Sequence, residues 1–213
     1  MNTIIIKKVT LLPAPEPPFV GTQFDILITP EERTFGFFSG TFADGSSEVA
    51  VDWGDGTTER YAEFSQLNHT YANPGEYCVR ISDDLAEFTQ SSLRTSDYWT
   101  YAARLLRVRS NAANLAELMT AAFRYAVNLA SVDFRQSGLS KLGAFVFSYC
   151  HALGPKIYLP NVYDLGTSVF LDCPGVLEIH FSKAHEAEIK AGPAYQETPP
   201  LSAESAEIFF DPV

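Results

Sequence analysis

Leu142-Gly-Ala-Phe-Val-Phe147 and Leu165-Gly-Thr-Ser-Val-Phe170 are two versions of one motif, and their spacing decides the fold. Leu118-Met-Thr-Ala-Ala-Phe123 is an earlier version, so the closing phenylalanines stand 24 and 23 residues apart. Because self-similarity at a fixed period marks stacked repeat units, we expect a solenoid of three to four repeats. Stacking should bury one residue of each repeat in a continuous core, namely Phe123, Phe147 and Phe170.

The similarity between repeats continues past these phenylalanines. The small residues Ala126, Cys150 and Cys173 align first, and the strand-like segments 132–134, 157–159 and 179–181 follow. One repeat earlier, Trp99, Ala102, Leu105 and Val108 fit the same frame. Side chains alternate along a strand, so Val132, Ile157 and Ile179 should face the core, together with Phe134, Leu159 and Phe181.

The residues between these apolar positions should face outward in columns that cross the repeats. The predicted ligand-binding column is Arg109, Asp133, Tyr158, His180 and, in the C-terminal segment, Phe209. A neighbouring column is Arg107, Ser131, Lys156, Glu178 and Glu207. Tyrosine is enriched at interfaces, so we take this face as the candidate binding surface for a protein or a glycan. The alternative is an ordinary solvated sheet face.

A different pattern fills the N-terminal part of the chain. Strand-like segments at 3–12, 24–28, 34–42, 48–53, 57–61 and 75–81 are separated by turn signals, which predicts a β-sandwich. Asp55-Gly56 between two such segments predicts a hairpin, where Gly54 and Gly56 supply backbone freedom. Trp53 offers a large apolar surface for a small core.

The acidic residues beside this hairpin allow two interpretations. Asp52 and Asp55 can accept hydrogen bonds from turn N–H groups, which is the favoured interpretation. Together with Asp44 they are also a weak candidate calcium site. No HExxH or CxxC motif occurs, and we expect neither another metal nor a cofactor.

The cysteines of neighbouring repeats also leave two possibilities open. Cys150 and Cys173 should lie on adjacent rungs about 4.8 Å apart, which is within reach of a disulfide. Their counterpart in the preceding repeat is Ala126, a core position, so two small buried thiols are the favoured interpretation.

The N-terminal motifs resemble those of the polycystic kidney disease (PKD) domain family. The resemblance rests on Val51-Asp-Trp-Gly-Asp-Gly-Thr57, on Asn68-His-Thr-Tyr71 and on Gly75-Glu-Tyr-Cys-Val79. It implies an immunoglobulin-like sandwich over residues 1–88, usually extracellular and used as a spacer or adhesive module. Tyr71 and Tyr77 would be structural residues of that module.

The repeats resemble the BspA-type leucine-rich repeats of bacterial surface proteins. This resemblance implies α/β repeats that form a solenoid over residues 89–213, and adhesion or ligand binding as the function. Residues 183–213 should cover its end, with a short helix at 183–191 and a strand at 207–210. The expected fold class is therefore mainly β with short helices.

Charge and composition narrow the classes of partner. The chain of 213 residues has a formal charge of −11, and the first 90 residues contribute −9 of it. Phosphate binding needs a basic stripe, so we expect no nucleic acid partner. No stretch of 18 apolar residues occurs, which predicts no membrane insertion. An apolar triplet precedes the lysines of Met1–Lys8, which is the wrong order for a secretory signal, although the family resemblance implies a surface or secreted protein.

These features favour a non-catalytic binding or adhesion module. The alternative is a structural or assembly protein, such as a phage, prophage or injection-system component. We expect no enzyme, because no nucleophile elbow, P-loop, dinucleotide fingerprint or Cys–His–Asp set occurs in the sequence. The ligand and the oligomeric state are left open.

Overall fold

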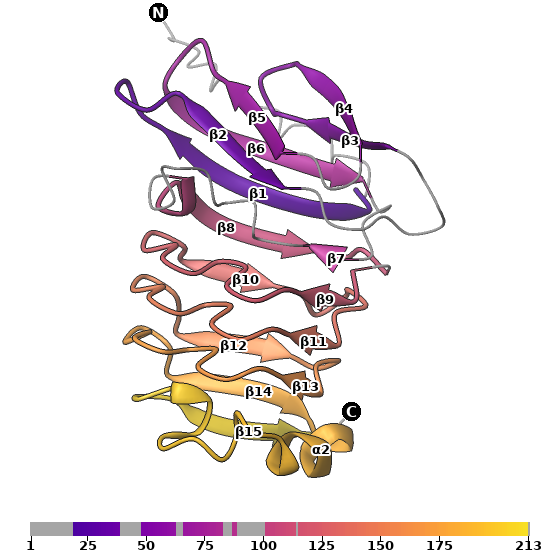
Figure 1. Cartoon of the computed structure of the whole chain (residues 1–213), viewed down its shortest axis with the longest axis vertical. Helices are drawn as coiled ribbons and strands as arrows, with labels where there is room; N and C mark the ends of the chain where they lie inside the picture. The colour runs from indigo at the N-terminus through magenta and orange to yellow at the C-terminus, as the bar shows by residue number, and fades with distance from the viewer. Residues whose placement is uncertain are drawn as a thin grey trace, which may run out of the picture.

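The computed structural model describes residues 19–38, 48–62, 66–82, 87–88, 101–113 and 115–212. The predicted strand at 3–12, Asp44 and Trp99 lie outside these residues. The described part is mostly β, as the sequence predicts, and its α2 (Glu186–Ala191) is a helix of only six residues. Figure 1 shows two arrangements of strands placed end to end, an N-terminal pair of sheets and a long stack.

The N-terminal strands form two antiparallel sheets. They are β1 (Gly21–Ile28), β2 (Thr34–Phe38), β3 (Glu48–Asp52), β4 (Thr58–Ala62), β5 (Gln66–Thr70) and β6 (Gly75–Ser82). One sheet contains β1, β6, β3 and β4 in that order, and β2 pairs with β5 in the other. The sequence pattern missed β5, because Leu67 is the only aliphatic side chain in Gln66–Thr70.

Aromatic side chains fill the space between these two sheets. Phe24 of β1 lies 5.5 Å from Phe37 of β2, and Phe37 lies 5.8 Å from Trp53, all measured between ring centroids. All three are buried. Burying rings of this size is worth about 1.5–3 kcal/mol each, so this cluster holds the sheets together.

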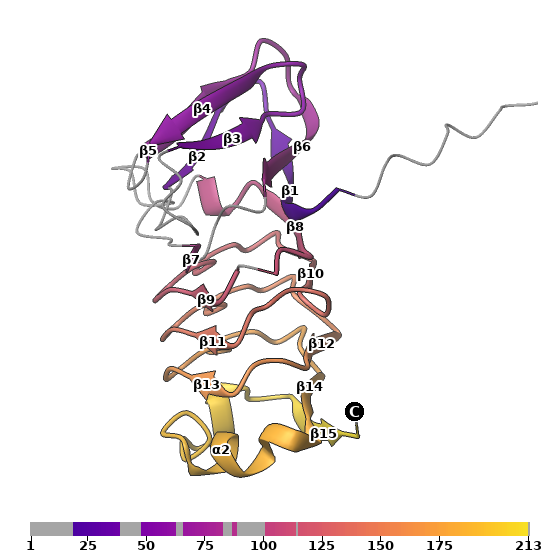
Figure 2. The same cartoon turned by 90° about the vertical axis from the view of Figure 1, so that its right-hand side faces the viewer.

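The rest of the chain coils into two ladders of parallel strands. The shorter strands form one sheet, whereas the longer ones are divided between two sheets. The longer strands are β8 (Leu105–Ser110), β10 (Ser131–Asp133), β12 (Lys156–Leu159), β14 (Glu178–Ser182) and β15 (Glu207–Asp211). The shorter ones are β7 (Glu87–Phe88), β9 (Glu117–Leu118), β11 (Lys141–Leu142) and β13 (Asp164–Leu165). Figure 2 shows the two ladders on opposite sides of the stack.

Turns, not helices, join the strands of this stack over residues 115–182. The expectation of α/β repeats is wrong for this part of the chain. Two residues in each coil have a positive φ, which interrupts helical hydrogen bonding. They recur at equivalent positions, as Ala121, Phe145 and Ser168 and then as Tyr125, Tyr149 and Asp172.

Identical positions of successive coils pack directly on one another. The rings of Phe123 and Phe147 stack at 5.7 Å between centroids, those of Phe147 and Phe170 stack at 5.4 Å, and all three are fully buried. Cys150 and Cys173 are free thiols. Their Sγ atoms donate to the carbonyl oxygens of Phe123 and Phe147, one coil earlier, at 3.1 and 2.9 Å.

The N-terminal sheet and the stack are joined through paired strands. β1 lies between β6 and β8, and β8 also pairs with β10, so one sheet continues from the N-terminal part into the first coil. Asp25 of β1 accepts ion pairs from Arg107 and Arg109 of β8, at 2.9 and 3.4 Å. The buried apolar side chains form one cluster from Phe24 to Ala203. Contacts therefore cross the boundary that the sequence places at residue 88.

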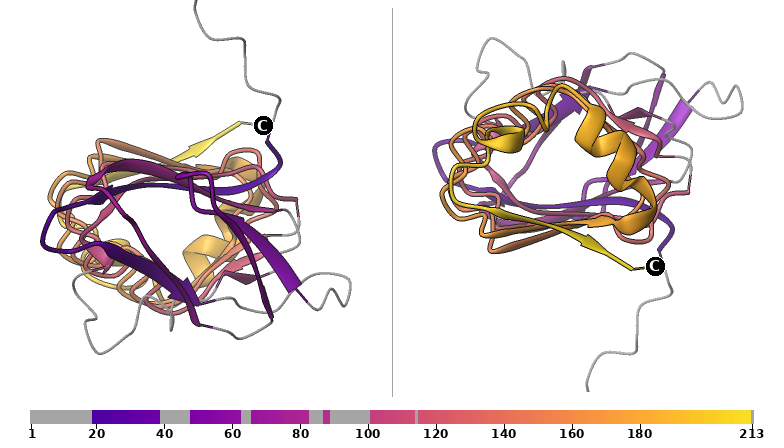
Figure 3. Two further views of the ribbon diagram at one scale, coloured as in Figure 1. Left: turned by 90° about the horizontal axis from the view of Figure 1, so that it is seen from above. Right: turned by 90° about the horizontal axis from the view of Figure 1, so that it is seen from below.

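The C-terminal segment lies across the far end of the stack (Figure 3). A 3-10 turn at Lys183–His185 leads into α2, a second turn follows at Pro200–Ser202, and β15 then pairs with β14. Ile189, Ala194 and Leu201 of this segment are buried. They continue the core of the coils and separate its last layer from water.

Candidate functional site

Three rings form a ladder on the outer face of the longer strands. Tyr158 of β12 pairs in register with His180 of β14, and His180 pairs with Phe209 of β15. The centroids of successive rings are 4.6 and 4.8 Å apart, and the rings are inclined by 23° and 12°. We call these residues the aromatic ladder. Tyr158 is 38% exposed, whereas the His180 side chain between its neighbours is 13% exposed.

The His180 ring is fixed by two carboxylates. Its Nδ1 lies 2.8 Å from Oδ2 of Asp211, and its Nε2 lies 3.0 Å from Oε2 of Glu178. The ring of His180 therefore lies between two carboxylates, one at each nitrogen. A hydrogen bond from Lys156 and a second one from His180 lower the pKa of Glu178, which keeps it ionised.

Arg135 extends the aromatic ladder toward the N-terminal end of the stack. Its guanidinium carbon lies 5.7 Å from the centre of the Tyr158 ring, within the range of a cation–π contact. The same guanidinium donates to both oxygens of Asp133, at 2.9 and 2.6 Å. These bonds from Arg135 hold the pKa of Asp133 below its usual value. Asp133, Arg135 and the aromatic ladder are thus one connected surface.

A hollow of about 420 Å³ lies beside the aromatic ladder, where the longer strands end. Arg135 follows β10, Asn161 follows β12, His185 follows β14 and Pro212 follows β15. Tyr158 and His180 also line it, with apolar surface from Ala184, Pro160 and Pro212. The hollow therefore combines ring edges and apolar groups with a few polar ones, which is the common make-up of a ligand site.

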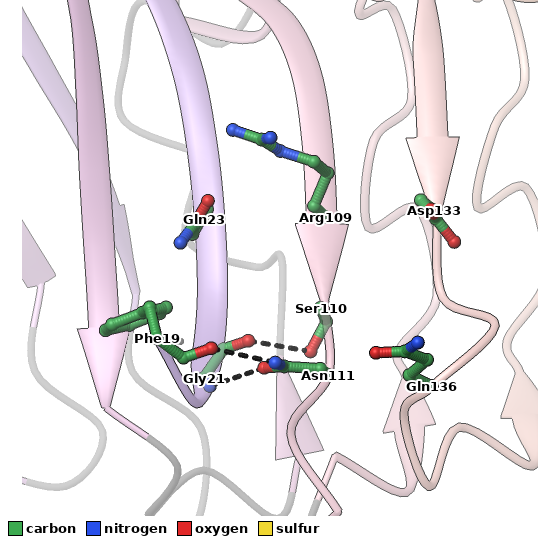
Figure 4. A pocket seen from close by; sticks show the side chains of 8 residues that line it. All are labelled: Phe19, Gly21, Gln23, Arg109, Ser110, Asn111, Asp133 and Gln136. Carbon is green, nitrogen blue, oxygen red and sulfur yellow. Dashed lines mark hydrogen bonds between the residues drawn. The ribbon is translucent and has the colours of Figure 1, made fainter. Parts of the chain in front are cut away.

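A second hollow of about 190 Å³ lies nearer the N-terminal sheet (Figure 4). The polar side chains of Gln23, Arg109, Asp133 and Gln136 line it, and Phe19 lines it as well. Its floor is fixed by Asn111, whose side chain accepts from the backbone N–H of Gly21 at 2.9 Å and donates to the carbonyl of Phe19 at 2.7 Å.

The two hollows lie on either side of one turn. Asp133 and Gln136 line the smaller hollow, and Arg135 between them lines the larger one. Both hollows therefore follow the carboxyl ends of the longer strands. We call this strip, from Gln23 to Pro212, the carboxyl edge of the outer face.

The structure divides the predicted ligand-binding column between these hollows. Arg109 and Asp133 line the smaller one, Tyr158 and His180 line the larger one, and Phe209 stacks on His180 without lining either. Sequence reasoning missed the turn residues Arg135, Gln136 and Asn161, and it missed Gln23 of β1. The strand period predicts which strand residues face outward, but it gives no signal for turn residues.

The predicted structural residues of the N-terminal motif tie down its hairpin. Asp52 accepts from the N–H of Gly54 at 2.9 Å, and Asp55 accepts from the N–H of Thr57 at 3.0 Å and pairs with His69 at 2.7 Å. The backbone of Gly54 has φ of 80° and that of Gly56 has φ of 93°. Both carboxylates therefore hold the turn.

Two tyrosines brace the same hairpin from the following strands. Tyr71 is buried and donates to the carbonyl of Trp53 at 3.0 Å, and burial raises its pKa above the usual value. Tyr77 donates to the carbonyl of Asn73 at 2.9 Å, and its ring lies 4.2 Å from that of Tyr71. In the described ranges, no group of three His, Cys, Asp or Glu side chains is placed to hold a metal ion.

Comparison with known proteins adds no assignment to this site. The scan of protein-family models, the search of curated proteins and the search of solved structures found no match. Within the part of the chain that the structure describes, no helix has the length and apolar character to cross a bilayer. Function is therefore argued from the geometry of the site itself.

Proposed function

We propose that this protein is a non-catalytic binding or adhesion module that recognises a protein or a glycan along the carboxyl edge. One observation carries the proposal: two hollows flank the 133–136 turn, and the exposed Tyr158 of the aromatic ladder borders the larger of them. Paired strands hold the strand residues of this surface in place before a ligand arrives. Such preorganisation reduces the entropy that is lost on binding.

We further propose that the architecture is a PKD-like sandwich, residues 1–88, joined to BspA-type leucine-rich repeats, residues 89–213. The antiparallel sheets around Trp53 support the first part. The 24- and 23-residue spacing of the stacked Phe123, Phe147 and Phe170 supports the second. This architecture favours a cell-surface or secreted setting for the adhesive function.

The contacts of the histidines support a non-catalytic function. Three His–carboxylate pairs join two strands or coils: His69 with Asp55 braces the hairpin, and His151 lies 3.1 Å from Asp172 of the next coil. His180 joins β14 to β15 through Asp211. A general base needs a ring nitrogen free to take a proton from a substrate, and both nitrogens of His180 are occupied.

A binding screen with a paired variant tests this function. The purified protein is applied to arrays of glycans and of cell-surface proteins, and the Tyr158→Ala/His180→Ala variant is applied in parallel. We expect a ligand that the wild type binds and the variant loses. Unchanged binding by a variant whose circular dichroism matches the wild type would show that this face is not the binding surface.

A further inference from the structure

We propose that the ligand of the carboxyl edge is an uncharged oligosaccharide chain that lies across both hollows. This inference rests on the binding function proposed above and adds the chemical class of the ligand. It follows from three properties of the edge: the pairing of its charges, the state of its amide groups and the division of its surface into two hollows.

The arginine, histidine and aspartate side chains that line the hollows all have an ion-pairing partner within the protein. Arg109 pairs with Asp25 at 3.4 Å, Arg135 with Asp133 at 2.6 Å, and His185 with Glu188 at 3.7 Å. His180 lies between two carboxylates, as described above. A charged ligand would have to compete with these partners and lose its own hydration, so the edge suits an uncharged one.

The amide groups of the edge are suited to hydroxyl groups. Gln23 and Gln136 line the smaller hollow, and their side-chain amides make no hydrogen bond to any residue that the structure describes. The Nδ2 atom of Asn161 donates to the carbonyl of Ser137 at 2.8 Å, which leaves its oxygen to accept from a ligand. An amide both donates and accepts, and so does a hydroxyl, so a polyhydroxyl chain can satisfy these groups without a charge.

The larger hollow adds the apolar surface that a sugar ring needs. Ala184, Pro160 and Pro212 line it beside the edges of Tyr158 and His180. The faces of these two rings are not available, because Tyr158 lies between Arg135 and His180, and His180 lies between Tyr158 and Phe209. Ring edges and small apolar groups can contact the C–H face of a sugar, while the neighbouring polar groups bind its hydroxyls.

An extended ligand explains why there are two hollows. The edge runs over five strands, from β8 to β15, and the paired strands among them lie about 4.8 Å apart. A disaccharide can occupy one hollow, whereas a longer chain can reach both.

Calorimetric titration of the full chain with defined sugars tests this inference. The probes are uncharged hexasaccharides of β-1,4-glucose, β-1,3-glucose, β-1,4-mannose and α-1,4-glucose, their disaccharides, and hexagalacturonate as the charged control. We expect at least one uncharged hexasaccharide to bind, about tenfold or more tightly than its disaccharide. Its affinity should be unchanged between about 0.05 M and about 0.5 M salt.

Point variants locate the bound chain. Tyr158→Ala should weaken binding of that hexasaccharide by about tenfold, and Gln136→Ala by about three- to tenfold. Leu177→Ala is the matched control, because Leu177 is 50% exposed but precedes β14, away from both hollows. It should leave the affinity unchanged.

The outcomes separate this inference from the proposed function. If only hexagalacturonate binds, or if no hexasaccharide binds while a protein from the screen binds and is lost in Tyr158→Ala, the oligosaccharide inference is wrong and the binding function stands. If an uncharged hexasaccharide binds equally to wild type, Tyr158→Ala and Gln136→Ala, the protein binds sugars elsewhere and both assignments of the edge are wrong.

Discussion

The ring of Tyr158 on β12 stacks on the ring of His180 on the neighbouring strand β14, with 4.6 Å between the ring centroids. Carboxylates on both ring nitrogens prevent His180 from turning away, so Tyr158 is held on a fixed support. A rigid exposed ring loses little entropy when a ligand contacts it. This relationship connects the packing of the coils with the proposed binding surface.

The first prediction concerns the stability of the last strand. His180→Ala removes two charge-assisted hydrogen bonds and two ring contacts that join β14 to β15 and β12. We expect the free energy of unfolding to fall by about 2–3 kcal/mol, and hydrogen exchange to accelerate in residues 207–211. Chemical denaturation and exchange mass spectrometry measure these effects.

His151→Ala is the control for that variant. His151 pairs with Asp172, but both side chains are about half exposed, at 50% and 51%. Exposed pairs contribute little, so we expect a change within about 0.5 kcal/mol. If both histidine variants destabilise the protein equally, the two carboxylates on His180 do not fix it as argued.

The second prediction concerns Gly143 and Gly166, the second residues of two versions of the motif. A Cβ atom at Gly166 would lie 2.3 Å from the backbone nitrogen of Ala144, and at Gly143 it would lie 2.4 Å from that of Thr120. The coils would have to separate, so Gly166→Ala should destabilise the protein by about 1–3 kcal/mol. Gly192→Ala is the control, because the nearest atom to its added Cβ would be the carbonyl oxygen of Ile189, at 3.3 Å. Equal effects in thermal denaturation would contradict this account.

The third prediction concerns the cysteines. Burial raises the pKa of Cys173 to about 12 and that of Cys150 well above its usual value, and burial with Asp25 raises that of Cys78. Because only a thiolate attacks disulfide reagents, the three thiols should react slowly with Ellman's reagent at pH 8 and rapidly after unfolding. Fast reaction of the folded protein would show that these sites are open to solvent.

The same raised pKa predicts a dependence of stability on alkaline pH. The neutral Cys173 thiol is favoured in the folded state, so its contribution is complete below about pH 9 and is lost as the pH rises toward 12. The loss can reach about 4 kcal/mol, because each tenfold change in the acid dissociation constant of the thiol corresponds to about 1.4 kcal/mol. Denaturation of Cys173→Ala between pH 8 and pH 11 should show a smaller slope than the wild type. An unchanged slope would contradict the assignment to Cys173.

The fourth prediction concerns the junction of the two parts. Removing residues 1–82 deletes β1 and leaves one edge of β8 unpaired, next to a core that β1 covered. Unpaired edges over apolar surface promote aggregation, so the shortened protein should be insoluble or oligomeric. A soluble monomer with cooperative unfolding would show that the N-terminal sheets are not needed to cover the stack.

Much of the fold could be predicted, because the period of a sequence reports its packing. The 24- and 23-residue spacing placed Phe123, Phe147 and Phe170 at equivalent positions, where the structure stacks them. The alternation within each strand likewise put Tyr158 beside His180, and the structure pairs these two in register. Such positions repeat, and repetition is visible in a single sequence.

The features that could not be predicted depend on backbone geometry and on tertiary contacts, neither of which produces a repeating pattern in the sequence. Tyr125 and Tyr149 have a left-handed backbone, a conformation in which glycine is the usual residue. Because tyrosine gives no signal for such a turn, the sequence did not indicate that turns replace the expected helices. The pairing of β8 with β1 brings together residues that are far apart in the sequence, such as Thr22 and Ser110. The hollows were missed because Arg135, Gln136 and Asn161 belong to turns, whose directions are set by that backbone.

The most direct test of the proposed binding surface is a map of amide chemical shifts. The isotope-labelled full chain is titrated with the ligand that the screen identifies, and the resonances that move are assigned. We predict that they cluster at residues 109–111, 133–136, 158–161 and 180–185, along the carboxyl edge. Shifts confined to the N-terminal sheets, or to the side of the stack formed by β9, β11 and β13, would contradict the account.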